Sequence, residues 1–194
     1  MKLLPNVITT FRILLAVIAV CFLQLNKTFQ LTAMILIPIV MILDLLDGVV
    51  ARKTQTNTLF GSVYDIAADR FIEYLFFIFF ATQSICSFWI VVIIIARGMS
   101  LDVIRSFALC RGKTAFGKTS MHQELWTDFL TNSRFSRGLY NTLKTLAFFF
   151  MAWQLYADLQ SIWIQALVWL TVLWAILRAI PVFIEGYKMR LINL

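Results

Sequence analysis

Long apolar runs separated by short polar breaks constrain the fold of this chain more than any other feature. A helix that crosses the hydrocarbon core of a bilayer needs about 20 mostly apolar residues. Such runs are expected at six places, residues 8–25, 30–52, 60–82, 87–109, 138–157 and 161–184. Of the 194 residues, 61% are hydrophobic and 14% are charged, against about 45–50% and about 25% in soluble domains. The sequence therefore predicts an all-α polytopic membrane protein with six transmembrane helices.

The polar parts of the chain are short enough to predict one membrane domain, residues 1–194, with a brief N-terminal interfacial segment before the first run. The N-terminus lacks the small-x-small cleavage site of a signal peptide, so the first run is expected to remain in the chain. Segment 111–137 separates the fourth and fifth runs and holds five of the seventeen basic residues. It is expected to contain a surface-lying helix near residues 122–131.

Lysine and arginine gather on one side of the predicted bundle. They lie near the N-terminus, in the turn after the second run, in segment 111–137 and in the C-terminal tail. Because Lys and Arg are enriched in cytoplasmic loops, this side and both termini are predicted to be cytoplasmic. We expect a bacterial inner-membrane protein whose basic face meets anionic headgroups or phosphorylated substrates, and no nucleic-acid partner.

Four of the ten acidic residues of this apolar chain lie close together, and they are Asp44, Asp47, Asp65 and Asp69. Asp44 and Asp47 are three positions apart at the end of the second run, which puts them on one helix face. Asp65 and Asp69 are four positions apart in the third run, so they also share a face. A short turn makes the two helices antiparallel neighbours. The two pairs are therefore expected to face each other near the cytoplasmic surface.

A bound metal would explain why these acids are tolerated. Carboxylates that face each other repel, and they cannot all stay ionised without a cation between them. Oxygen ligands without thiolate or imidazole suit Mg²⁺ or Mn²⁺, and four carboxylates could hold two such ions. The small residues Gly48, Ala51 and Gly61 permit close packing or the approach of a ligand. Arg52 adds a guanidinium, which fits a phosphate oxygen.

The acids also fit other roles. They could cap helices or pair with Arg52, Lys53 and Arg70, although the cost of acids in a membrane favours a functional site. Intramembrane acids also mark ion paths, so a divalent-cation transporter is the alternative outside the enzymes. Against it, the acids cluster at one end of the helices, and the accompanying Gly, Ala and Arg have no role in ion passage. A catalytically silent scaffold is the third alternative.

The stretch from Asp44 to Asp69 resembles the signature of the CDP-alcohol phosphotransferase family, integral membrane enzymes of phospholipid synthesis. Its spacing reads D-x2-D-G-x2-A-R-x8-G-x3-D-x3-D, with eight fixed positions over 26 residues. The opening "PNVITTFRI", with Pro5, Asn6, Thr9 and Arg12, is also similar to the start of bacterial glycerophosphate and inositol-phosphate members. The resemblance covers the first 110 residues well and the remainder loosely.

This resemblance implies a six-helix homodimer that transfers a phosphatidyl group from CDP-diacylglycerol to a small polar acceptor and releases CMP. It implies that Asp44, Asp47 and Asp65 bind metal, and that Asp69 binds a second ion and acts as general base. The CDP-lipid would then contact the second acid of the motif and the residues that follow it, which are Asp47, Gly48, Ala51, Arg52 and Gly61. Divalent metal ions stabilise charge in phosphoryl transfer, which agrees with this assignment.

The acceptor is indicated by basic residues elsewhere. The family branch that makes phosphatidylglycerophosphate is the most similar, and it implies that Arg97, Arg105 and Lys144 hold the phosphate of glycerol 3-phosphate. The same three side chains could instead be interfacial anchors. Three departures from that branch, Gly98, Arg70 and the long segment 111–137, leave inositol phosphate, inositol and serine open as acceptors.

Overall fold

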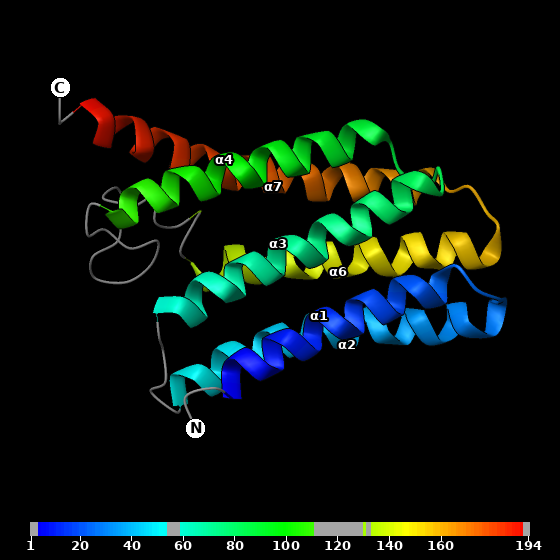
Figure 1. Ribbon diagram of the computed structural model, residues 1–194. Coiled ribbons are helices and arrows are strands. Elements are labelled where there is room, and N and C mark those ends of the chain that lie inside the picture. Colours follow the sequence, from blue (N-terminus) through cyan, green and yellow to red (C-terminus); the bar gives the residue numbers. More distant parts are fainter. Residues whose placement is uncertain (1–3, 54–58, 111–129, 131–132, 192–194) are drawn as a thin grey trace. The chain divides into compact units, whose positions relative to one another are not determined.

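The computed structural model describes residues 4–53, 59–110, 130 and 133–191, with the side chains of residues 4–5, 45–53, 59, 62, 109–110, 134 and 189–191 outside the description. The described residues form helices without strands. These are α1 (Leu4–Leu23), α2 (Lys27–Lys53), α3 (Leu59–Thr82), α4 (Phe88–Cys110), α6 (Arg134–Ala157) and α7 (Ile162–Leu191) (Figure 1). The predicted all-α class is confirmed. The surface helix expected near residues 122–131 falls almost wholly outside the described residues.

The helices agree with the six apolar runs and extend beyond several of them. The first helix starts at Leu4, so most of the segment expected to lie at the interface belongs to α1. Pro5 is compatible with this start, because the first turn of a helix does not need its N–H groups. The last helix continues to Leu191, past the end of its apolar run, since hydropathy marks where the hydrocarbon ends and not where the helix does.

Three of the described helices are long and apolar enough to cross a membrane. These spans are Asn6–Leu23, Lys27–Asp44 and Ile162–Lys188. The other helices carry more charged and polar residues: α3 holds Asp65 and Asp69, and α4 holds Arg97, Asp102 and Arg105. The expectation of six spans is therefore supported by composition for half of the helices.

The chain divides into two compact units. Unit 1 comprises Met1–Val91 and Thr145–Gln165, and unit 2 comprises Val92–Lys144 and Ala166–Leu194. In unit 1, α1 packs against both α2 and α3 (Figure 1). Farther along α3, the buried rings of Phe76 and Phe77 lie 5.0 and 4.9 Å from the ring of Phe148 on α6. These aromatic contacts fix α3, which carries two of the four acids.

Unit 2 is built from α4, the first part of α6 and most of α7. Leu101 and Ala108 of α4 form a buried cluster with Ala179 and Val182 of α7, and the two helices run side by side (Figure 1). Ile104 packs against this cluster. A Cβ atom on Gly186 of α7 would lie 2.8 Å from Cγ2 of Ile104, so the two helices approach more closely than a side chain at Gly186 would allow.

Replacing Gly186 by Ala is therefore expected to destabilise unit 2. The overpacked methyl group should cost about 1–3 kcal/mol, which exceeds or matches the gain of about 1 kcal/mol in helix propensity. The apparent melting temperature in detergent should fall by about 2–4 °C for each net kcal/mol lost. Gly138→Ala on α6 is the matched control, because no atom lies within 4 Å of its added Cβ. A rise in the melting temperature of both variants would contradict the close packing of α4 on α7.

Candidate active site

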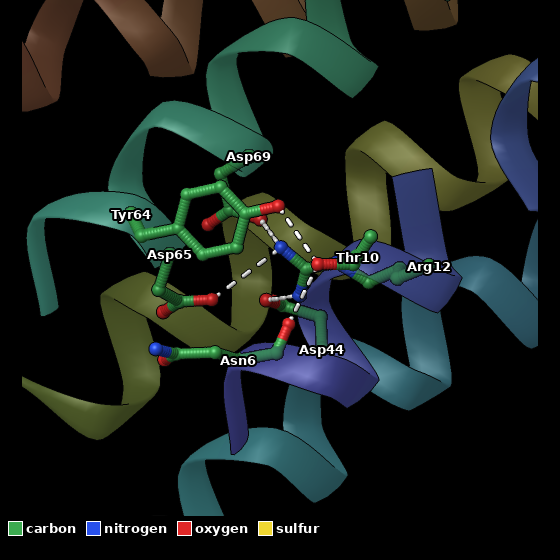
Figure 2. A network of polar contacts seen from close by, with 7 residues as sticks. All are labelled: Asn6, Thr10, Arg12, Asp44, Tyr64, Asp65 and Asp69. Atoms are coloured by element: carbon green, nitrogen blue, oxygen red, sulfur yellow. Dashed lines mark hydrogen bonds and ion pairs between the residues drawn. The ribbon is translucent and has the colours of Figure 1, made fainter. Parts of the chain in front are cut away.

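The acids of α2 and α3 converge in unit 1. Asp44 lies near the end of the apolar part of α2, and Asp65 and Asp69 lie one turn apart on α3. All of them reach the same point (Figure 2). Two helices thus bring together three of the four carboxylates expected to face each other. Asp47 lies on α2 with its side chain outside the described residues. We call Asp44, Asp65 and Asp69 the acidic cluster.

A guanidinium from α1 lies within the acidic cluster (Figure 2). Nη2 of Arg12 is 2.8 Å from Oδ1 of Asp69 and 3.5 Å from Oδ1 of Asp65. Nη1 of Arg12 donates to Oδ1 of Asp44. The expected alternative partners of the acids were Arg52, Lys53 and Arg70. Arg70 pairs with Glu73 at 3.1 Å, and the side chains of Arg52 and Lys53 lie outside the described residues. The structure adds a cation from the first helix, Arg12, to the acidic cluster.

Burial differs sharply across this network. Arg12 is 1% exposed and Asp44 is 17% exposed, whereas Asp65 and Asp69 are 43% and 41% exposed. The guanidinium of Arg12 is therefore buried in the protein, whereas the carboxylates of Asp65 and Asp69 are partly accessible from outside. A buried guanidinium needs several acceptors to offset its lost hydration, and the carboxylates supply them.

A second contact ties α1 to α3 beside the acidic cluster. The hydroxyls of Thr10 and Tyr64 are 2.9 Å apart, and the Thr10 hydroxyl also lies within hydrogen-bonding distance of the carbonyl oxygen of Asn6, at 2.8 Å (Figure 2). The ring of Tyr64 stacks on Phe60 at 6.0 Å. The first two turns of α1 are therefore held against α3 at the level of the acids.

The donor set of the acidic cluster is chemically suited to a hard divalent cation, since it consists of carboxylate oxygens. Within the part of the chain that the structure describes, no three His, Cys, Asp or Glu side chains are gathered tightly enough to hold a metal ion. The three carboxylates are instead arranged around the guanidinium of Arg12. The positions expected to contact the CDP-lipid lie nearby in the helices: Gly48, Ala51 and Arg52 on α2, and Gly61 on α3.

A cluster of cations forms in unit 2. The charged groups of Arg97, Lys144 and Arg178 lie 5.3, 5.5 and 5.3 Å from the centre of the Tyr140 ring. These residues come from α4, α6 and α7. Each cation is attracted to the ring face by its quadrupole, at distances typical of cation–π contacts. We call Arg97, Lys144 and Arg178 with Tyr140 the cation cluster.

Three residues of the cation cluster, Arg97, Tyr140 and Lys144, are buried, and Arg178 is half-buried. Arg97 and Lys144 are 9% and 6% exposed, so neither is the interfacial anchor that was considered as an alternative. Nε of Arg97 donates to the carbonyl of Ala175 at 2.8 Å. Its Nη1 atom is buried and has no hydrogen-bond partner among the described residues. A buried guanidinium N–H without a partner is costly and indicates that an acceptor completes the site.

Arg105, the third residue predicted to hold an acceptor phosphate, lies on α4 with Arg97. Its Nη1 is 4.0 Å from Oδ1 of Asp102, one turn earlier on α4. Of the three residues predicted to hold an acceptor phosphate, the structure therefore brings Arg97 and Lys144 together in the cation cluster, and it gives Arg105 an acidic neighbour on its own helix.

Sequence reasoning missed three residues of these clusters, which are Arg12, Tyr140 and Arg178. The sequence gives Arg12 only a place in the N-terminal opening and assigns Arg178 no role. The signal that could have found them is their place within long apolar runs, because an arginine in a membrane segment is costly and marks a functional site by default. Tyr140 carries no comparable signal, since tyrosines are common near membrane interfaces.

Comparison with known proteins identifies the family. The family model described as CDP-alcohol phosphatidyltransferase matches residues 2–177, which include both the acidic cluster and Arg97, Tyr140 and Lys144. A search of curated proteins gives no match. The matched family comprises transferases of phospholipid synthesis that use a CDP-alcohol and an alcohol acceptor and are generally dependent on divalent metal. This chain belongs to the CDP-alcohol phosphatidyltransferase family, and it is a membrane transferase that carries out phosphotransfer in lipid synthesis.

Proposed function

We propose that this enzyme transfers the phosphatidyl group of CDP-diacylglycerol to a phosphorylated acceptor, glycerol 3-phosphate, and thereby makes phosphatidylglycerophosphate. The observation that carries the choice of acceptor is the cation cluster. Two buried cations and one half-buried cation surround one neutral ring, and a phosphate dianion would offset most of their charge. Guanidinium groups also match phosphate oxygens geometrically.

The alternatives differ in how well they use these charges. Inositol phosphate carries the same phosphate group and remains the alternative closest to the proposal. Free inositol and serine have no phosphate, so they would bring no negative charge to the buried Arg97 and Lys144, and the desolvation of these two cations would be offset less. The cation cluster therefore favours a phosphorylated acceptor over a free alcohol.

In the proposed reaction, the acceptor hydroxyl oxygen forms a bond to the β-phosphorus of CDP-diacylglycerol, and the bond from that phosphorus to the bridging oxygen breaks. CMP leaves, and Asp69 takes the proton of the hydroxyl. Asp69 is suited to this role because it lies on the open side of the acidic cluster and because a general base must reach the proton that it accepts.

The remaining assignments concern the metal and the donor. Asp44, Asp47 and Asp65 are the proposed ligands of Mg²⁺ or Mn²⁺, with Asp69 shared by a second ion. Bound divalent ions neutralise the charge on the phosphates of the donor. Gly48, Ala51 and Gly61 leave room for the CDP group, and Arg52 is the proposed contact to its phosphates. Arg105 is proposed to add positive charge to the acceptor site.

The proposal extends to membrane placement. The chain is proposed to be one domain, residues 1–194, with six transmembrane helices, both termini and the active site on the cytoplasmic side of a bacterial inner membrane, and a homodimeric assembly. The distribution of Lys and Arg in the loops supports this orientation.

The test is CMP release by purified protein supplied with CDP-diacylglycerol, Mn²⁺ or Mg²⁺, and one acceptor at a time. Glycerol 3-phosphate is expected to support release, and serine and inositol are expected to give no more than the reaction without acceptor. Chelation of the metal with EDTA should stop the reaction, and added Mn²⁺ should restore it. Release with serine or inositol alone would contradict the proposed acceptor class. Uptake of Mn²⁺ into vesicles without CMP release would favour the transporter alternative.

A further inference from the structure

One aromatic ring joins the cations of the cation cluster. The charged groups of Arg97, Lys144 and Arg178 lie 5.3, 5.5 and 5.3 Å from the centre of the Tyr140 ring. Tyr140 is 5% exposed, and it lies one turn before Lys144 on the same face of α6. The ring therefore contacts one cation from each of the helices α4, α6 and α7 of unit 2.

Lys144 depends on this ring most directly. Its side chain is 6% exposed, and among the described residues its ammonium group is held by the ring of Tyr140 without a hydrogen bond or an ion pair. A buried ammonium group ordinarily donates to oxygen acceptors. The ring face therefore fixes the position of Lys144 while its N–H donors stay available to a ligand.

The two arginines have a second attachment to the backbone. Nε of Arg97 donates to the carbonyl of Ala175 at 2.8 Å, and Nε of Arg178 donates to the carbonyl of Leu130 at 3.4 Å. The contact with the Tyr140 ring adds another point at which each guanidinium is held. Nη1 of Arg97 is buried and has no partner within the described parts of the chain, so at least this donor is left for an incoming acceptor atom.

A neutral ring gathers cations without neutralising them. Like charges held around one centre repel one another, and the quadrupole of the ring attracts each of them while the ring carries no net charge. A carboxylate at this position would form ion pairs with the cations and would compete with an anionic ligand. Attraction by a ring is weaker than the cost of taking a charge out of water. Arg97 and Lys144 therefore keep positive charge that a phosphate can meet.

We infer that Tyr140 is a positioning residue for the phosphate of the acceptor, because the face of its ring holds Arg97, Lys144 and Arg178 at one point and leaves their charge to the ligand. This inference rests on the proposed function. Tyr140 acts through the three cations and not by touching the reacting atoms. The ring face is the part of the side chain that this role requires, and the hydroxyl group is not.

The test is the KM for glycerol 3-phosphate, measured by CMP release with purified full-length protein. Tyr140→Phe keeps the ring, and its KM is expected to stay within about threefold of the wild-type value. Tyr140→Leu removes the ring and keeps an apolar side chain, and its KM is expected to rise by about 3–30-fold, which corresponds to the loss of cation–π attraction. The KM for CDP-diacylglycerol and kcat should change much less, because the donor does not meet these cations.

Tyr156→Leu is the matched control. Nζ of Lys27 lies 5.4 Å from the centre of the Tyr156 ring, but Lys27 is 53% exposed and both residues belong to unit 1. Loss of this ring should leave the KM for glycerol 3-phosphate unchanged. A merely structural role of Tyr140 would lower the melting temperature and would change kcat and both KM values together.

Three results would overturn the inference or its basis, and they differ. Unchanged KM for glycerol 3-phosphate in Tyr140→Leu would show that the cations keep their places without the ring. An equal rise in Tyr140→Phe and Tyr140→Leu would assign the effect to the hydroxyl group. Absence of CMP release by the wild type with glycerol 3-phosphate would instead remove the proposed function, and this inference with it. If Tyr140→Leu does not fold, Tyr140→Met supplies the comparison, and equal KM values in Tyr140→Met and Tyr140→Phe contradict the need for a ring.

Discussion

Replacement of Asp69 by Asn is expected to lower the rate of CMP release at saturating substrates by at least about 100-fold, which is the lower end of the contribution of a general base. An amide cannot accept the proton of the acceptor hydroxyl, and it is a weaker metal ligand than a carboxylate. Asp69 also contacts Arg12 at 2.8 Å, so the melting temperature of the variant must be measured beside its rate in order to separate chemistry from stability.

Asp158→Asn is the control for this prediction. Asp158 is an acid of the same unit, 79% exposed and paired with Lys27, and its replacement should leave the rate unchanged. Full activity of Asp69→Asn at wild-type stability would refute the assignment of the base. A pH–rate profile adds a second check, because the limb that reports an essential base should disappear or shift in the variant that retains measurable activity.

Replacement of Lys144 by Met is expected to raise KM for glycerol 3-phosphate by about 10–100-fold, since a hydrogen bond to a charged group is worth about 1.5–3 kcal/mol. Methionine keeps the apolar stem of the side chain and removes its charge. The KM for CDP-diacylglycerol should stay near the wild-type value, and kcat should change much less than KM. Arg178→Met should behave in the same way, because Arg178 faces the same ring of Tyr140 as Lys144.

Lys27 provides a closely matched control for the Lys144 variant. Its Nζ lies 5.4 Å from the centre of the Tyr156 ring, almost the same distance as that from Lys144 to Tyr140, but the side chain is 53% exposed. Lys27→Met removes a lysine over a tyrosine outside the proposed site, and it should leave both KM values unchanged. An unchanged KM for glycerol 3-phosphate in both Lys144→Met and Arg178→Met would remove the proposed phosphate site.

The helices could be predicted from the sequence because their signal is local. Runs of apolar residues long enough to cross a bilayer specify helices, since only a helix satisfies its backbone within one segment there. Expected runs at 30–52 and 87–109 therefore became α2 (Lys27–Lys53) and α4 (Phe88–Cys110). The runs predicted the ends of helices less well. The described α1 begins at Leu4 and α7 runs to Leu191, which extends them beyond the apolar runs 8–25 and 161–184.

The pairing of the acids was also largely accessible from the sequence. Helical periodicity puts Asp65 and Asp69 on one face of α3, and the short connection to α2 makes Asp44 a neighbour. The cation that meets them was not accessible. Arg12 is 57 positions from Asp69, and the periodicity of α1 does not determine which neighbour its polar face will meet.

The sequence by itself determined the all-helical fold, the eight-position motif and the family of transferases to which the chain belongs. It did so because hydropathy and spacing along one helix are properties of consecutive residues. Only the tertiary structure decided that Arg12 holds the acidic cluster and that Arg178 joins Arg97 and Lys144 around Tyr140. The physical reason is that such clusters depend on the rotation and depth at which helices pack, which are set by contacts between side chains far apart in the chain.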